Sequence, residues 1–336
     1  MTGRWLRWLL SLARPPGRGD GPARLTILRH HRVYADGERP LYRLGVAESV
    51  LDRQLALLAE VGLTPVTVGE GLAHLASGGG GHRVALTFDD GYRDNVTRAL
   101  PLLLRRDARA TFYLTAGLIE RREAPWWDVL AHALTATRVT SLDSPLWAGP
   151  TTLDGAPARR AALARWLPAF RLPPRERDAR LDELRVALGV RESAPCELAS
   201  WDETAALGRA GMQVGAHTLT HPHLSLLDPA GQHDEIAGSI ALVRARLGIE
   251  CDGFAYPGGD HDRTTLRLVR DLGLAHAVTT RAGDNRAGAD PLALRRRGFT
   301  EGACLDPAGR FSRRLALAEV DGAFDRLRGR SPEVAA

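Results

Sequence analysis

Two adjacent carboxylates, Asp89 and Asp90, follow an apolar run over residues 84–88 and precede Gly91. The run predicts a buried strand, and the glycine permits a turn where a Cβ would clash. Neighbouring carboxylates at a strand end repel each other unless a proton or a cation lies between them. On its own the stretch is equally compatible with a solvated turn, so a cation site here is a hypothesis that requires further ligands.

Two histidines that follow another predicted strand are candidates for those ligands. His217 and His221 are four residues apart, a spacing that lets two imidazoles converge on one metal if the segment turns. Pro222 prevents a long helix beyond them. An isolated pair of this kind is also compatible with two unrelated surface histidines. In a parallel barrel, however, all strands end on the same face, and this would bring both histidines to the aspartates.

The elements that must position these residues alternate between strand and helix. Strands are predicted at 25–28, 65–68, 84–88, 110–114, 212–216, 253–256, 276–280 and 292–296. Helical spacing of apolar residues predicts helices at 46–61, 69–76, 95–105, 201–210, 235–247, 264–272 and 311–327. Ser200 and Glu203 form a capping-box pattern at the start of one helix. About eight strand–helix units favour an α/β fold of the (β/α) barrel type over an open sheet.

The alternation breaks between about residues 121 and 199, where the pattern is mostly helical and rich in arginine. We interpret this stretch as an insertion in a barrel that spans residues 25–318. Residues 1–24 form a basic and aromatic N-terminal segment with a linker, and residues 319–336 form a helix end and a tail. Trp126 and Trp127 open the insertion. Stacking on sugar rings and packing in a core are equally compatible with this pair.

Composition restricts the class of protein. The chain has 336 residues, of which 44% are apolar and 25% are charged, as in soluble globular proteins. The net charge is +5, and every basic residue is an arginine. These arginines are scattered along the sequence, which argues against nucleic-acid binding. Cys196, Cys251 and Cys304 are too few and too far apart for a disulfide framework, which favours a reducing compartment such as the cytoplasm.

The first 13 residues combine tryptophans and leucines with two arginines. The segment is too short and too charged to span a bilayer, and it lacks the apolar core of a signal peptide. It is compatible with a frayed terminus or with a short interfacial helix. In the second case we expect peripheral contact with the inner face of the membrane.

The two motifs together resemble the polysaccharide deacetylase superfamily, carbohydrate esterase family 4. The resemblance rests on Thr87-Phe88-Asp89-Asp90-Gly91 and on His217-Thr218-Leu219-Thr220-His221-Pro222. It covers residues 25–120 and 198–300, and it implies a distorted (β/α) barrel of seven or eight strands. It also implies that Asp90, His217 and His221 hold a divalent metal and that Asp89 is the general base. This ligand set suits zinc, with nickel, cobalt and iron as alternatives.

A third motif, Phe254-Ala255-Tyr256-Pro257-Gly258-Gly259, resembles the family segment in which a backbone N–H after a proline binds the oxyanion. The resemblance assigns this N–H to Gly258. Many members have an arginine where Ala255 stands and a tyrosine where Gly258 stands, which indicates a subfamily difference. Tyr256, Pro257 and His223 are expected to line the substrate site.

Two further assignments follow from the resemblance. The family often has an arginine on a late strand that pairs with the base aspartate, and Arg296 fits this position best, in competition with Arg295 and Arg297. A solvated basic strand edge is the alternative.

Residues 26–33 resemble the early Tyr-His-x-Val segment of exopolysaccharide deacetylases with permuted motif order, with His30 in place of the tyrosine. In that subfamily the histidine is the general acid, which here is His31.

The sequence therefore predicts a metal-dependent hydrolase that removes N-acetyl groups from an acetylated polysaccharide, oligosaccharide or glycan precursor. Two alternatives remain open. One is an inactive glycan-binding protein on the same fold, and the other is an amidohydrolase that acts on a non-sugar amide.

Overall fold

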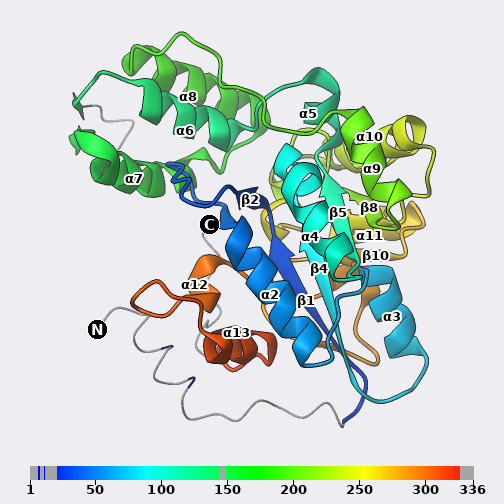
Figure 1. Cartoon of the computed structure of the whole chain (residues 1–336). Coiled ribbons are helices and arrows are strands. Elements are labelled where there is room, and N and C mark those ends of the chain that lie inside the picture. The colour runs from blue at the N-terminus through cyan, green and yellow to red at the C-terminus, as the bar shows by residue number, and fades with distance from the viewer. Residues whose placement is uncertain (1–6, 8–10, 12–20, 144–148, 326–336) are drawn as a thin grey trace.

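A curled, mostly parallel sheet of eight strands forms the centre of the protein (Figure 1). The computed structural model describes residues 7, 11, 21–143 and 149–325. The sheet order is β10-β9-β8-β5-β4-β1-β11, and β12 also pairs with β1. The strands are β1 (Arg24–His30), β4 (His82–Phe88), β5 (Ala110–Leu114), β8 (Gln213–Ala216), β9 (Gly253–Ala255), β10 (His276–Val278), β11 (Asn285–Arg286) and β12 (Arg297–Gly298).

One segment links the two sides of the curled sheet. Leu294 forms a parallel bridge to Val278 of β10, and three residues later Arg297 pairs in parallel with Leu28 of β1. Residues 294–298 therefore lie between β10 and β1, as in a distorted barrel. The predicted fold class, an α/β barrel of irregular shape, is confirmed.

The central strands are buried because apolar residues occupy both of their faces, as is usual for parallel strands covered by helices. The pair β1 and β4 is in continuous register from Arg24 opposite His82 to His30 opposite Phe88. The strands β5 and β8 continue the same direction. The residues that follow the strand ends, among them His31, Asp89 and His217, are therefore placed at one edge of the sheet.

Helices cover the sheet (Figure 1). They are α2 (Glu48–Glu60), α3 (Val68–Ala76), α4 (Leu100–Arg105), α5 (Ala116–Arg121), α9 (Trp201–Arg209), α10 (Pro229–Leu247), α11 (Arg263–Asp271), α12 (Glu301–Cys304) and α13 (Arg313–Val320). The predicted capping box of Ser200 and Glu203 is present at the start of α9. Within the described part of the chain, no helix is both long enough and apolar enough to cross a membrane.

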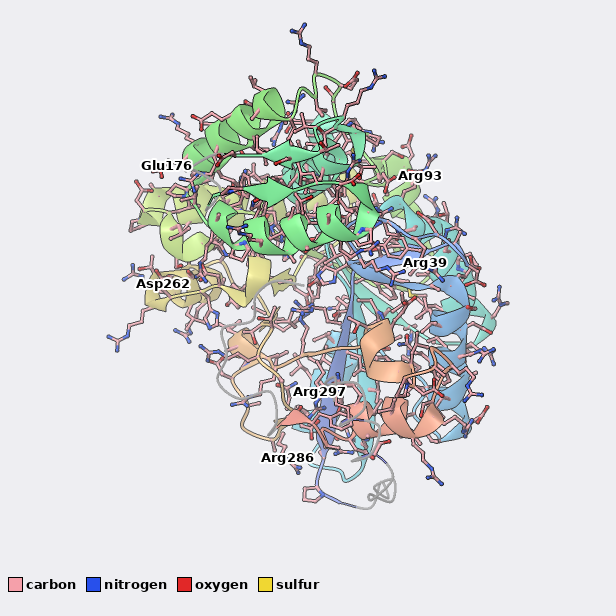
Figure 2. All side chains as sticks on the ribbon, turned by 90° about the vertical axis from the view of Figure 1, so that its left-hand side faces the viewer. Arg39, Arg93, Glu176, Asp262, Arg286 and Arg297 are labelled. Carbon is pink, nitrogen blue, oxygen red and sulfur yellow. The ribbon has the colours of Figure 1, made fainter. Side chains whose placement is uncertain are left out.

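Between α5 and α9 the chain forms a small helical layer with its own core. It contains α6 (Trp126–Ala136), α7 (Gly155–Trp166) and α8 (Pro174–Ala187), with the short hairpin β6 (Ser141–Leu142) and β7 (Thr151–Thr152). Leu134, Leu163, Trp166, Phe170 and Leu184 form the centre of this core. The three helices lie together at one end of the sheet in Figure 1, and Glu176 marks α8 at the same end in Figure 2.

Several predicted elements differ from the structure; α10, for example, begins at Pro229, whereas the helix was predicted at 235–247. The strand predicted at 65–68 is reduced to one bridge between Val66 and Ala85, because Thr67 caps α3 and the helix begins at Val68. The first two residues of the strand predicted at 292–296 instead belong to a short 3-10 turn, η6 (Pro291–Ala293), since Pro291 fixes its φ and lacks an N–H. The closing helix, α13, begins later than predicted and ends at Val320. The N-terminal interfacial helix, apart from Arg7 and Ser11, lies outside the described residues.

Candidate metal and catalytic centre

Asp90, His217 and His221 converge at the carboxyl ends of β4 and β8. One ligand atom from each lies within 4.8 Å of the others. The Nε2 atoms of His217 and His221 lie 3.5 Å and 3.7 Å from Oδ1 of Asp90. Two imidazoles and one carboxylate in this arrangement form a ligand set for a divalent metal with positions left for water and substrate.

The carboxylate of Asp90 fits a bound cation. The residue is buried, and within the described chain neither of its oxygens has a hydrogen-bond partner. Burying an ionised carboxylate without hydrogen-bond donors has a large cost in free energy. Burial and the charge of Asp89 raise the pKa of the Asp90 carboxyl well above its usual range. A cation between the three side chains would remove this penalty.

The backbone around the ligands is held in an uncommon conformation. Asp90 has φ 76°, Thr218 has φ 66° and His221 has φ 55°, all in the left-handed region that non-glycine residues rarely adopt. The segment that carries the histidines is fixed by Glu235 of α10, which accepts the N–H groups of Leu219 and Thr220 at 2.8 Å and 2.9 Å. This carboxylate therefore holds the turn that brings the two imidazoles together.

A second hydrogen bond fixes the tautomer of His217. Its Nδ1 lies 2.7 Å from the carbonyl oxygen of Ala255, so Nδ1 carries the proton and Nε2 presents its lone pair toward Asp90. Burial lowers the pKa of His217 and holds that of His221 well below its ordinary value. Both imidazoles are therefore neutral at pH 7, as metal ligands must be.

Asp89, the neighbour of the proposed ligand Asp90, pairs with Arg296. The guanidinium donates from Nη1 and Nη2 to the two carboxylate oxygens, both at 2.7 Å. Arg296 is itself fixed by the carbonyl of Thr279 at 2.8 Å and the hydroxyl of Thr87 at 3.0 Å. Burial alone would raise the pKa of Asp89, but the charge and hydrogen bonds of Arg296 outweigh it, so the pKa lies below its usual range. Asp89 is therefore ionised.

Arg295 and Arg297, the other two candidates for the pair with Asp89, contact other residues. Arg297 lies at the end of the barrel away from the helical layer (Figure 2), where its guanidinium contacts Asp284 and Asp325. Arg295 is exposed and donates to the carbonyl of Ala282.

His31 follows β1 beside the end of β4. The amide of Asp89 donates to the carbonyl of His30 at 3.0 Å, which ties the two strand ends together. Burial lowers the pKa of His31 to about 3, partly offset by the charge of Asp89. His30 has a different role, because its buried ring stacks on Phe88 with centroids 5.2 Å apart. His30 is thus a core residue.

The third motif forms a tight turn after β9. Gly258 has φ 59°, and a Cβ at this position would lie 3.2 Å from Cε1 of His223, so His223 borders Gly258. Tyr256, by contrast, is fully buried, and its hydroxyl donates to the carbonyl of Leu292 at 2.8 Å. Tyr256 therefore supports the turn from behind and offers a substrate no surface, contrary to our expectation. Pro257 is also buried.

Two residues near the candidate metal centre were not predicted from the sequence to act on the proposed ligands. Trp127 of α6 packs against His221 with ring centroids 4.4 Å apart, and its indole N–H donates to the hydroxyl of Tyr92 at 2.8 Å. The charge of Arg29, at the end of β1, partly offsets the raised pKa of Asp90 and adds to the effect of burial, which lowers the pKa of His217. Trp126 and Trp127 stood out in the sequence at the start of the insertion. Only the folded structure shows that Trp127 contacts the proposed metal ligand His221.

Comparisons with known proteins agree with this geometry. The sequence model of the family described as "Polysaccharide deacetylase" matches residues 77–277, which include Asp89, Asp90, His217 and His221. An uncharacterized protein of Streptomyces coelicolor is 37% identical over 90 residues, which are 27% of this chain and 36% of that protein.

Solved structures share the fold. The deacetylase PplD of Streptococcus pyogenes is 20% identical, with a TM-score of 0.58 over 86% of this chain and 96% of that chain. IcaB of Ammonifex degensii is 22% identical, with a TM-score of 0.56 over 90% and 98% of the two chains. The deacetylase domain of BpsB from Bordetella bronchiseptica is 16% identical, with a TM-score of 0.52 over 84% and 97%. Because the family match spans more than half of the sequence and includes the convergent aspartates and histidines, this chain belongs to the polysaccharide deacetylase family.

Proposed function

We propose that the protein is a metal-dependent hydrolase that removes N-acetyl groups from a glycan or glycan precursor. The observation that carries this proposal is the convergence of Asp90, His217 and His221 next to an ionised Asp89 that is paired with Arg296. Membership of the polysaccharide deacetylase family supports the same reaction class.

In this proposal Asp90, His217 and His221 hold the divalent metal, for which zinc is the best fit to the ligand set. When bound, such a metal lowers the pKa of a water molecule and polarises the acetyl carbonyl. Asp89 accepts a proton from the attacking water, and Arg296 keeps this carboxylate ionised and oriented. The low pKa makes Asp89 a weak base, so its contribution depends on position more than on basicity.

The remaining groups act on the acetyl group and on the leaving amine. The oxygen of water bonds to the carbonyl carbon, the C–N bond breaks, and acetate and a free amine are released. In this proposal the N–H of Gly258 stabilises the oxyanion, and His31 delivers a proton to the amine. Since the pKa of His31 is about 3, the imidazole is neutral before the reaction and must first receive that proton. The neighbouring Asp89 is its source.

The test is an assay of acetate release from N-acetylglucosamine oligomers, combined with metal analysis of the purified protein. Asp89→Asn should abolish hydrolysis while metal is retained, and Asp90→Asn should lose both. Asp234→Asn, an exposed acid on α10, is the matched control and should change neither. Full activity of Asp89→Asn would show that the base is assigned wrongly. Glycan affinity without metal and without hydrolysis would favour a binding protein, and hydrolysis only of non-sugar amides would favour a different amidohydrolase.

A further inference from the structure

A cavity opens beside His31, and none of the three proposed metal ligands lines it. It is lined by Arg29, Arg43, Gly45, Gly298 and Thr300, together with His31 and adjoining residues of the same segments. Two of the lining residues carry a full positive charge, and none of them is acidic. The cavity therefore presents cationic groups next to the proposed catalytic centre.

Arg29 connects the cavity with the centre. It is half-buried at the end of β1, and its Nη2 lies 3.9 Å from the position that a Cβ on Gly298 would occupy. Together with burial, which has the larger effect, its charge lowers the pKa of His31. The charge of Arg29 thus acts on His31, and both residues line the cavity.

Arg43 also lines the cavity and is exposed. The strand that follows it, β3 (Gly45–Ala47), is fixed against β2 (Arg32–Tyr34). At Gly45 the approach is so close that a Cβ would lie 2.2 Å from the carbonyl oxygen of Arg32. The backbone next to Arg43 is therefore held in place at the cavity.

Arg43 differs from other arginines around the proposed centre, because those arginines form ion pairs with carboxylates. Arg296 is neutralised by Asp89, Arg171 pairs with Asp260, and Arg177 pairs with Asp178. Arg43 has no carboxylate within ion-pair distance among the described residues. An exposed guanidinium at a concave surface binds carboxylate or phosphate oxygens through paired N–H donors. The hydroxyl of Thr300, which makes no capping bond to α12, is a further donor.

We propose that this cavity binds an anionic group of the substrate, a carboxylate or a phosphate, next to the acetyl group that is removed. The enzyme then prefers an acidic or phosphorylated N-acetylated glycan over a neutral one. This inference rests on the proposed function, because it assigns the substrate class of the same centre.

The experiment compares three substrates on the metal-loaded protein: a neutral N-acetylglucosamine oligomer, the same oligomer with a uronate unit, and the same oligomer with a terminal phosphate. We expect kcat/KM to be higher for at least one of the anionic forms. Arg43→Gln should reduce the ratio of anionic to neutral kcat/KM by about tenfold, mainly through KM, as expected for one charge-assisted hydrogen bond. The uronate and phosphate arms identify which anion is recognised.

Arg83→Gln is the matched control, because Arg83 is an exposed arginine at the opposite end of β4. It should leave the ratio unchanged. Equal use of all three substrates, or an equal loss for all three in Arg43→Gln, would overturn the inference while leaving deacetylation intact.

Calorimetric binding of the same three oligomers separates the two proposals. Tighter binding of an anionic oligomer that is lost in Arg43→Gln would support the cavity even if no oligomer is hydrolysed, in which case the proposed function fails alone.

Discussion

The indole ring of Trp127 lies edge-on against the imidazole of His221, with ring centroids 4.4 Å apart and planes at 66°. Trp127 belongs to the helical layer, whereas His221 belongs to the loop after β8. The indole N–H also donates to Tyr92, and the Tyr92 hydroxyl donates to Asp128 at 2.9 Å. The helical layer is therefore joined to the candidate metal centre through a contact with one of its ligands.

This contact predicts that Trp127→Phe weakens metal binding. The phenyl ring retains part of the packing but lacks the N–H that fixes the orientation of the indole, so His221 gains freedom. We expect the metal affinity to fall by about 10- to 100-fold, the usual range for residues that orient a ligand. Competition with a chromogenic chelator measures the change. Trp126→Phe is the control, since Trp126 stacks on Phe170 within the helical layer. Unchanged affinity in Trp127→Phe would reduce Trp127 to a packing residue.

The pair of Arg296 and Asp89 predicts a large effect on stability. Arg296→Gln leaves a buried carboxylate without its cation, and this should reduce the free energy of unfolding by about 3–5 kcal/mol. Arg296→Lys keeps the charge but loses the bidentate hydrogen bonds to Asp89, so it should reduce the free energy of unfolding less than Arg296→Gln does. Urea denaturation measures both. Arg295→Gln, at the exposed neighbouring position, should change the value by less than about 0.5 kcal/mol. An equal loss in all three variants would contradict the role of the pair.

The residues that lie at strand ends were predictable because their positions depend on strand order and direction. Once the barrel was expected, Asp89, Asp90, His217 and His221 had to meet at one edge. The structure brings the three ligand atoms together. The choice of Arg296 among three consecutive arginines was also made from the sequence, and the ion pair is present.

Other parts depended on contacts that no local pattern encodes. Tyr256 was expected to line the substrate site, but the carbonyl of Leu292, 36 residues away in sequence, accepts its hydroxyl inside the core. Glu235 was only the first residue of the helix predicted at 235–247, yet it holds the histidine loop. The strand predicted at 65–68 was lost because a capping box with Glu70 favoured a helix start there.

The proposed role of His31 predicts a dependence on the leaving group. An amine is a poor leaving group and needs a proton, whereas the phenolate of an activated aryl acetate leaves without one. His31→Ala should therefore reduce amide hydrolysis by about 10²–10⁴-fold, the range for general acid catalysis, and should reduce aryl acetate hydrolysis far less. Steady-state kinetics with both substrates measure the difference. Equal losses for the two substrates would show that His31 supports the structure of the site and does not act as the acid.

His82 predicts how stability depends on pH. The ring lies at the end of the barrel away from the metal ligands, where Nδ1 accepts from Arg24 at 2.8 Å and Nε2 donates to Thr26 at 2.9 Å. Burial and the charge of Arg24 lower the pKa of His82 from its ordinary 6.5 to about 4. Between these values the unfolded chain binds a proton at this residue and the folded chain does not. The stability that the neutral ring contributes is therefore complete above pH 6.5 and is lost as the pH falls toward about 4.

The expected slope from this one residue is about 1.4 kcal/mol per pH unit within that window. His82→Gln replaces the imidazole with an amide that accepts from Arg24 and donates to Thr26 but does not titrate, so the unfolding free energy should fall less steeply as the pH decreases. Urea denaturation of both proteins between about pH 7.5 and about pH 5 measures the two slopes. His233→Gln, an exposed histidine on α10, is the control. Parallel curves for wild type and His82→Gln would show that His82 carries no part of the acid sensitivity.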